Sequence, residues 1–160
     1  MIRMKVKVVG VDQRSMLPVV VITDTQERGF IPIVIGPAEA NAITIQLEGI
    51  QPPRPITHDL ITSIIEAFGA KIVKIAITDL RDETYYARIY IETAKGQLDI
   101  DARPSDAIAL ALRTNCPIYI TEQVAAKAMV NNKPIDDEEI EQFKQMLDNL
   151  TPDDFKKNLH

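Results

Sequence analysis

Polar side chains that could carry chemistry gather in two short segments of this 160-residue chain. The first segment reads RPITHD and covers residues 54–59, and the second reads DIDARPSDA and covers residues 99–107. Each of them leads into the first turn of a predicted helix. The first N–H groups of a helix lack partners within the helix and attract anions and carboxylates. These two helix starts are therefore where we expect a functional site.

The RPITHD segment has a structural and a chemical interpretation. Thr57 suits the N-cap position, and Asp59 lies in the first turn, where a carboxylate gains about 0.3–1 kcal/mol. His58 is less expected there, because the positive end of the helix dipole disfavours an imidazolium ion. A neutral histidine at this place could act as a base or a metal ligand. The residues alone leave open whether His58 is functional or has a capping or packing role.

The DIDARPSDA segment has three interpretations. Asp99 and Asp101 lie two residues apart on one face of a strand. Backbone N–H groups at the following helix start could hold a phosphate together with Arg103. Asp101 and Asp106 could instead bind a hard cation such as Mg²⁺ through their oxygens. The third interpretation is an internal network of arginine and aspartate that fixes the strand–helix junction.

The composition excludes several classes of protein. With 46% apolar and 26% charged residues, the chain is typical of a soluble globular protein. No apolar run approaches the ~18 residues of a membrane span, and Lys5 and Lys7 interrupt any signal-peptide core. The single Cys116 gives no disulfide framework. We therefore expect a cytoplasmic protein without a membrane partner.

The common cofactor and catalytic motifs are absent from the sequence. The six glycines form no G-x-G-x-x-G, no P-loop and no G-x-S-x-G motif. Two histidines are too few for a histidine-rich zinc site. These absences leave the two polar segments as the places to look for chemistry.

The charge distribution argues against a basic nucleic-acid binder. The net charge is −5, and the last thirty residues alone hold eight acidic and four basic side chains. A domain that binds nucleic acid through its overall field is usually strongly basic. Any contact with RNA or DNA must therefore use a local basic patch.

Hydrophobic periodicity predicts an α+β fold in a single compact domain. We expect a mixed sheet of six or seven strands, about four packed helices and an added C-terminal helix. The predicted strands are 4–12, 17–25, 30–35, 71–79, 84–93, 97–101 and 117–120, and the predicted helices begin at Pro37, Thr57, Pro104 and Glu122. The stripe of the second helix consists of Leu60, Ile61, Ile64, Ile65 and Phe68.

The chain divides into two parts at residue 130. Residues 1–130 form the predicted domain, and residues 131–160 form an acidic helical C-terminal tail. In the tail, Asp136 and Glu139 have the spacing of a capping box, ahead of a stripe of Ile140, Phe143 and Leu147.

Two helix starts of the domain resemble each other. PAEANAITI (37–45) aligns without gaps with PSDAIALAL (104–112), so that Glu39 matches Asp106. Each segment follows three predicted strands. An internal duplication of a three-strand-plus-helix unit would explain this, and so would a common local way to start a helix.

Three segments, in this order, resemble the bifunctional nuclease domain family: IPIVIGPAEANAI, RPITHDL and LDIDARPSDAIALALR. The resemblance covers residues 6–129. This family of bacteria and archaea was long a domain of unknown function, and its plant members are described as acting on both RNA and DNA. The resemblance implies an α+β fold, self-association and nuclease activity. The family motif falls on Glu39, Arg54, Pro55, Thr57, His58, Asp59, Asp101, Arg103, Pro104, Ser105, Asp106 and Arg113.

Two functional hypotheses follow. The first is a nuclease that hydrolyses phosphodiester bonds of RNA or DNA with Mg²⁺ or Mn²⁺, with Asp101 and Asp106 as candidate metal ligands. Its expected catalytic residues are His58, Asp59, Asp101 and Asp106, and its expected substrate-binding residues are Arg54, Arg103, Ser105 and Glu39. The second is a non-catalytic module that binds a small anionic ligand or a protein partner. Under the first hypothesis, the two polar segments must lie within hydrogen-bonding reach of each other.

The sequence also predicts a homodimer or larger homo-oligomer. The tail helix has an exposed apolar stripe, and the strands are strongly β-prone. Light scattering at micromolar concentration should show a mass of at least two chains. A monomer alone under these conditions would contradict the prediction.

Overall fold

The computed structural model describes residues 1–131 together with residues 141 and 145. In this part of the chain, seven strands and four helices form one α+β domain, as predicted. The strands are β1 (Ile2–Val11), β2 (Pro18–Asp24), β3 (Phe30–Val34), β4 (Lys71–Arg81), β5 (Thr84–Thr93), β6 (Gly96–Ala102) and β7 (Ile118–Ile120). The helices are α1 (Pro37–Leu47), α2 (Thr57–Ala67), α3 (Pro104–Thr114) and α4 (Glu122–Ala128). The predicted tail helix and its capping box lie outside the described residues.

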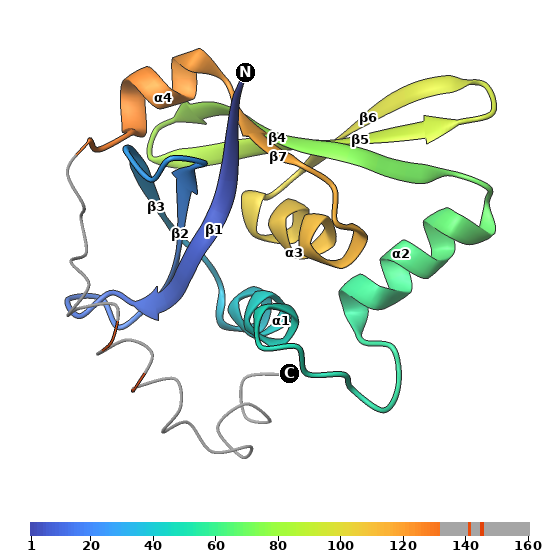
Figure 1. Cartoon of the computed structure of the whole chain (residues 1–160), viewed down its shortest axis with the longest axis horizontal. Helices are drawn as coiled ribbons and strands as arrows, with labels where there is room; N and C mark the ends of the chain where they lie inside the picture. The colour runs from blue at the N-terminus through green and yellow to red at the C-terminus, as the bar shows by residue number, and fades with distance from the viewer. Residues whose placement is uncertain (132–140, 142–144, 146–160) are drawn as a thin grey trace.

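The strands form one mixed sheet in the order β3-β2-β1-β7-β4-β5-β6 (Figure 1). The short strand β7 pairs parallel with β4 and antiparallel with β1. On each side of β7, three consecutive strands pair antiparallel. The half formed by β1 to β3 leads into α1, and the half formed by β4 to β6 leads into α3. The three-strand-plus-helix arrangement suggested by the sequence thus occurs twice.

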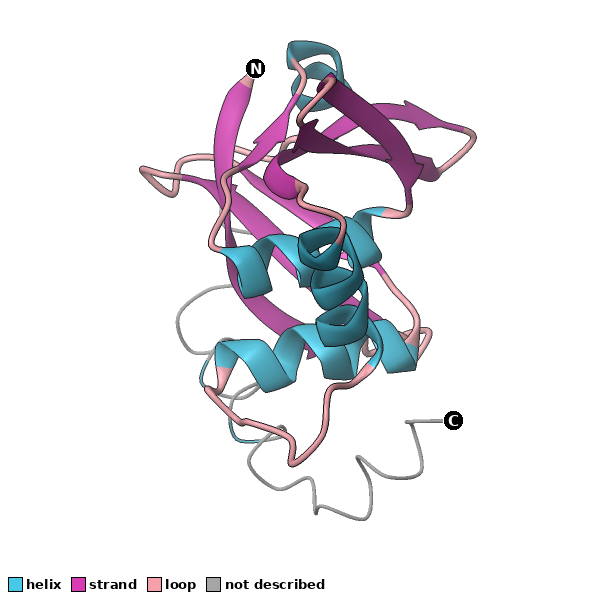
Figure 2. Cartoon of the chain, turned by 90° about the vertical axis from the view of Figure 1, so that its right-hand side faces the viewer, coloured by secondary structure: helices cyan, strands magenta, loops and turns pink. Residues whose placement is uncertain are grey.

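Helices α1, α2 and α3 lie together on one side of the sheet, and α4 lies apart from them near the N-terminus (Figure 2). Helix α3 contacts both α1 and α2 and also packs on β4 and β5. Its buried face includes Ala107, Ala109 and Ala111, whose small side chains let neighbouring elements approach closely. α3 is therefore the central helix of the layer, because α1 and α2 both pack against it.

The start of α2 differs in detail from the prediction. Ile56, rather than Thr57, occupies the N-cap position, and no side chain there caps the helix. Instead the carboxylate of Asp59 accepts a hydrogen bond from the Ile56 N–H at 3.1 Å. The first turn is thus stabilised by the acid at the third helical position.

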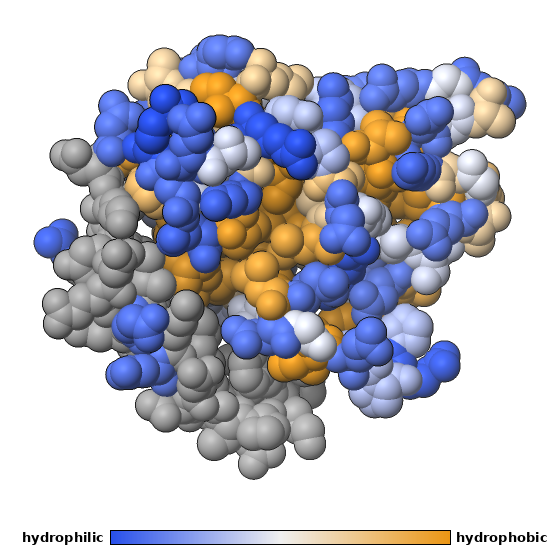
Figure 3. Space-filling view, in the orientation of Figure 1, coloured by the Kyte–Doolittle hydropathy of each residue, from blue (hydrophilic) through white to orange (hydrophobic). Residues whose placement is uncertain are grey.

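The apolar stripe predicted on α2 divides between two faces. Ile61 and Ile65 pack against the core, whereas Leu60, Ile64 and Phe68 are exposed. The expectation of a single buried stripe was therefore wrong for three of its five members, because α2 lies at the border of the helix layer and only its inner face meets the core. In Figure 3, apolar atoms reach the surface among polar ones on the side of α2 and β6.

No helix in the described part of the chain has the length and the apolar character needed to cross a bilayer.

Candidate functional site

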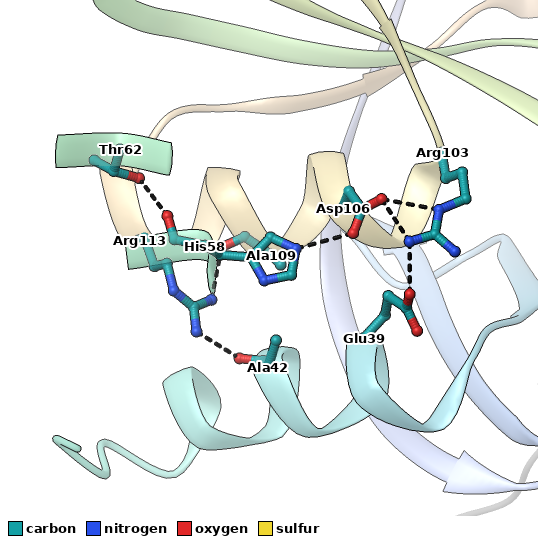
Figure 4. A network of polar contacts seen from close by, with 8 residues as sticks. All are labelled: Glu39, Ala42, His58, Thr62, Arg103, Asp106, Ala109 and Arg113. Atoms are coloured by element: carbon teal, nitrogen blue, oxygen red, sulfur yellow. Dashed lines mark hydrogen bonds and ion pairs between the residues drawn. The ribbon is translucent and has the colours of Figure 1, made fainter. Parts of the chain in front are cut away.

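The two polar segments meet where the start of α2 lies beside α3 (Figure 4). Nε2 of His58 lies 2.9 Å from Oδ1 of Asp106. Nε of Arg103 donates to Oδ2 of Asp106 at 2.9 Å, and its Nη2 donates to Oε1 of Glu39 at 2.6 Å. The expected convergence is thus confirmed by the pair of His58 and Asp106. The four side chains form one network that links α1, α2 and α3.

The repeated architecture places the two acids of this network at equivalent positions. Glu39 is the third residue of α1 and Asp106 is the third residue of α3, and each helix has proline at its first position. The residue before α3 is Arg103, whereas the residue before α1 is Gly36. A Cβ atom at Gly36 would collide with the carboxylate of Glu39. Glycine therefore lets this carboxylate fold back over its own helix start and reach Arg103.

A second cluster, around Arg113, lies at the other end of α3. Its Nε donates to Oδ1 of Asp59 at 2.8 Å, its Nη1 to the carbonyl of Ala109 at 2.9 Å and its Nη2 to the carbonyl of Ala42 at 3.1 Å. The side chain of Arg113 is 5% exposed. A buried guanidinium needs such partners, because an unpaired buried charge is costly. Arg113 thus ties α3 to α1 and α2 from inside the layer.

The environment of Asp106 keeps this residue in its charged form. Its pKa is lowered below the ordinary value of 3.8, first by the hydrogen bond with His58 and further by Arg103, although burial acts in the opposite direction. The hydrogen bonds of Arg103 to Glu39 and Asp106 raise the pKa of its guanidinium. The network therefore holds an ionised carboxylate between a cation and a histidine ring.

The side chains of this network do not form a metal site in this arrangement. Within the described ranges, no group of three or more His, Cys, Asp or Glu side chains lies close enough together to hold a metal ion. Both carboxylate oxygens of Asp106 already accept hydrogen bonds from His58 and Arg103. Asp101 lies exposed on β6, opposite Arg88 of β5. The structure thus does not bring Asp101 and Asp106 into a common set of ligands with a third such group.

The other residues singled out from the sequence occupy different surroundings. Arg54 lies exposed in the loop before α2 and makes no hydrogen bond or ion pair with a described residue. Both oxygens of Asp59 are engaged, one by Arg113 and one by the Ile56 N–H. Ser105 is 5% exposed and lines a pocket together with Arg103.

This pocket has a volume of about 350 Å³. Its walls are residues 32–36 on one side, residues 83–85 on another and residues 103–105 at the start of α3; we call it the seam pocket. It lies between strand β3 and the start of β5, which are far apart in the sheet order. Glu39, His58 and Asp106 do not line it, so Arg103 is the member of the network that lines this pocket.

Two features of the site were not assigned from the sequence. Arg113 belongs to the family motif, but the sequence does not indicate what its side chain does. Its distance of seven residues from Asp106 puts both on one face of α3, and a lone arginine in an alanine- and leucine-rich helix was the available signal. Tyr85 of the seam pocket had no such signal, because its position there depends on the curvature of the sheet.

We expect Asp59→Ala to lower the free energy of unfolding by about 3 kcal/mol, because Arg113 would be left buried without its carboxylate. Urea unfolding of the purified variant measures this change. Glu66→Ala is the matched control, because Glu66 is exposed on the same helix, and it should change the free energy by less than about 0.5 kcal/mol. Equal effects of both substitutions would contradict the role given to Asp59.

We expect Asp106→Asn to cost about 2 kcal/mol at pH 7, as is typical of hydrogen bonds to a charged group. A carboxyl group with a pKa lowered by folding stabilises the protein above its ordinary pKa, and this contribution is lost as the pH falls through the folded value. The difference between wild type and variant should therefore shrink below pH 3.8. Asp101→Asn, at an exposed position, is the control and should change the free energy of unfolding by less than about 0.5 kcal/mol. A difference for Asp106→Asn that is constant with pH would contradict the network.

Comparison with known proteins supports one family. The family model of the bifunctional nuclease domain matches residues 20–133. An uncharacterised protein of Mycobacterium tuberculosis is 38% identical over 163 residues, which cover 95% of this chain and 98% of the relative. Bifunctional nuclease 1 of Oryza sativa subsp. japonica is 26% identical over 99 residues, or 60% of this chain and 30% of the plant protein. Bifunctional nuclease 2 of Arabidopsis thaliana is 24% identical over 99 residues, which again cover 60% of this chain and 30% of the plant protein. The chain belongs to the bifunctional nuclease domain family.

Proposed function

We propose that this protein hydrolyses phosphodiester bonds of RNA or DNA, and that Arg103 binds the phosphate. The observation that carries the proposal is the orientation of Arg103 at the seam pocket. Glu39 and Asp106 hold its Nε and Nη2, and Nη1 makes no hydrogen bond with a described residue. In Figure 4 this third nitrogen points away from both carboxylates. A guanidinium fixed in this way presents its free donors in one direction.

The start of α3 supplies further donors for an anion. The N–H groups of Ser105 and Asp106 lie in the first turn, where no carbonyl of the helix reaches them. Such N–H groups, together with the helix dipole, favour a phosphate. Negative charge develops on the phosphate oxygens during hydrolysis, and donors already in place stabilise that charge without reorganising. Arg103 and the first turn of α3 would perform this task.

His58 is suited to act as a general base, because its hydrogen bond with Asp106 fixes the tautomer of the ring. The ionised carboxylate of Asp106 accepts a hydrogen bond from the Nε2–H of His58, and in this tautomer the free electron pair of the ring lies on Nδ1. Nδ1 is then the atom that would take a proton from an attacking water. The His58 side chain is 7% exposed, so the substrate-bound protein must admit this water. We assign no step to Asp59 or Asp101, which stay predictions from the sequence.

The predicted dependence on Mg²⁺ or Mn²⁺ also stays a prediction. In the part of the chain that the structure describes, no third His, Cys, Asp or Glu joins His58 and Asp106 in a set of metal ligands. Cleavage assays with EDTA, with Mg²⁺ and with Mn²⁺ test the dependence directly.

A second candidate function is a module that binds an anionic ligand without cleaving it. It is favoured by the position of His58 and Asp106 outside the lining of the seam pocket. A ligand seated in the pocket would contact Arg103 and would not touch the histidine. Binding of nucleic acid or nucleotide without hydrolysis would support this function over the first.

The test is cleavage of end-labelled single-stranded RNA and DNA by the purified full chain. We expect wild type to cleave and Arg103→Lys to lose at least tenfold in rate, because lysine cannot keep the forked contacts to two carboxylates and a phosphate. His58→Asn should lose about 10²–10⁴-fold, the usual contribution of a general base. Both variants should remain folded by circular dichroism.

Arg88→Lys is the matched control for Arg103→Lys. Arg88 is a half-exposed arginine on β5 whose partner is Asp99, and its replacement should leave the rate unchanged. If pure wild type cleaves neither substrate under any metal condition, the proposed nuclease function is wrong. If Arg88→Lys and Arg103→Lys lose the same activity, the assignment of the phosphate to Arg103 is wrong.

A further inference from the structure

The seam pocket has features of a ligand site beyond its contact with Arg103. Its volume of about 350 Å³ lies at the low end of the range of small-molecule sites, ~300–1,000 Å³. Its walls come from both halves of the sheet and from α3. Ser105 is 5% exposed, lines the pocket, and its hydroxyl has no hydrogen-bond partner among the described residues. The Ser105 oxygen is not fully buried, so it is open to the pocket and can form a hydrogen bond with a ligand.

The charged groups decide which wall of the pocket takes an anion. The α3 wall carries Arg103, the hydroxyl of Ser105 and the free N–H groups of the first turn of α3. Glu83, in the turn before β5, also lines the pocket. A phosphate would be repelled by the Glu83 carboxylate and attracted by Arg103. The anionic group of a ligand therefore belongs at the α3 wall.

The wall formed by residues 83–85 offers an aromatic ring instead of positive charge. Tyr85 lines the pocket, and part of its side chain packs against the hydrophobic core. Burial raises the pKa of its hydroxyl, so the ring is neutral at physiological pH. A ring held by the core is a fixed surface on which a nucleobase can stack. The Glu83 carboxylate beside it can accept a hydrogen bond from an exocyclic amino group.

We infer that the seam pocket binds a single nucleotide, with its phosphate at Arg103 and Ser105 and its base against Tyr85. This inference rests on the proposed function for the phosphate position and adds the substrate class. A base must leave the stack of its neighbours to enter a pocket of this size. The substrate is therefore single-stranded nucleic acid, and a nucleoside monophosphate alone should occupy the same place.

Isothermal titration calorimetry of the full chain with AMP, adenosine and inorganic phosphate tests the inference. AMP should bind at least tenfold more tightly than either adenosine or phosphate, because only AMP carries both the phosphate for Arg103 and the base for Tyr85. Tyr85→Leu keeps apolar contact with the core but has no ring, and it should weaken AMP at least tenfold while leaving phosphate unchanged. Ser105→Ala should weaken both AMP and phosphate.

Two further variants keep the test independent of folding defects. Tyr90→Leu is the matched control for Tyr85→Leu, because Tyr90 lies on the opposite face of β5, under Lys74, and it should leave AMP binding unchanged. Val34→Trp fills the pocket from the edge strand β3, where Val34 is 56% exposed. It should abolish AMP binding without lowering the melting temperature. AMP binding that is no tighter than phosphate binding, or that survives Val34→Trp, would overturn the inference.

The outcomes separate this inference from the proposed function. Cleavage of RNA or DNA by a chain that does not bind AMP would leave the nuclease function standing and refute the nucleotide pocket. AMP binding with the expected variant effects, but without cleavage, would support the pocket and refute the nuclease function. Equal rates of cleavage for single-stranded and duplex substrates would refute the single-strand preference.

Discussion

A charge buried in a protein must be paired, and the helix layer of this domain is arranged around that requirement. Arg113 is almost fully buried, and its partners come from α1, from α2 and from α3 itself. If α2 moved away, the guanidinium would lose its carboxylate, and if α1 moved away, it would lose a carbonyl oxygen. Leaving a buried charge without a partner destabilises the fold by more than a typical exposed ion pair stabilises it. The position of all three helices thus depends on one arginine.

The opposite end of α3 carries a second arginine in a different environment. The side chain of Arg103 is 64% exposed, compared with 5% for Arg113. Its two carboxylate partners sit in the first turns of α1 and α3, where the helix dipoles compensate their negative charge. Arg103 can therefore remain oriented and still offer free donors to a ligand. The two ends of α3 thus hold one buried arginine and one exposed arginine.

Much of this arrangement could be predicted from the sequence, because it depends on local patterns. Alternation of apolar residues predicted the strands, and proline followed by an acid predicted the starts of α1 and α3. The contact between His58 and Asp106 was expected because both segments begin helices and carry polar groups that need partners. The equivalence of Glu39 and Asp106 was visible in the aligned segments, although their common partner Arg103 was not.

Other features depend on packing that no local pattern contains. The five apolar residues of the α2 stripe all suit a core, and only the position of α2 at the border of the layer exposes Leu60, Ile64 and Phe68. The carbonyl of Ala42 that receives Arg113 could not be identified, because backbone acceptors look alike in a sequence. The seam pocket is lined by residues of β3, of the start of β5 and of α3, and only the tertiary structure brings these segments together.

The central claim is that Arg113 stabilises the helix layer and that Arg103 serves the pocket. The free energy of unfolding of Arg113→Met and of Arg103→Met, measured by urea denaturation at pH 7, tests it most directly. The account predicts a loss of about 3–5 kcal/mol for Arg113→Met, which breaks a buried pair, and of about 1 kcal/mol or less for Arg103→Met, whose own side chain is 64% exposed. Equal losses, or a larger loss for Arg103→Met, would contradict the account.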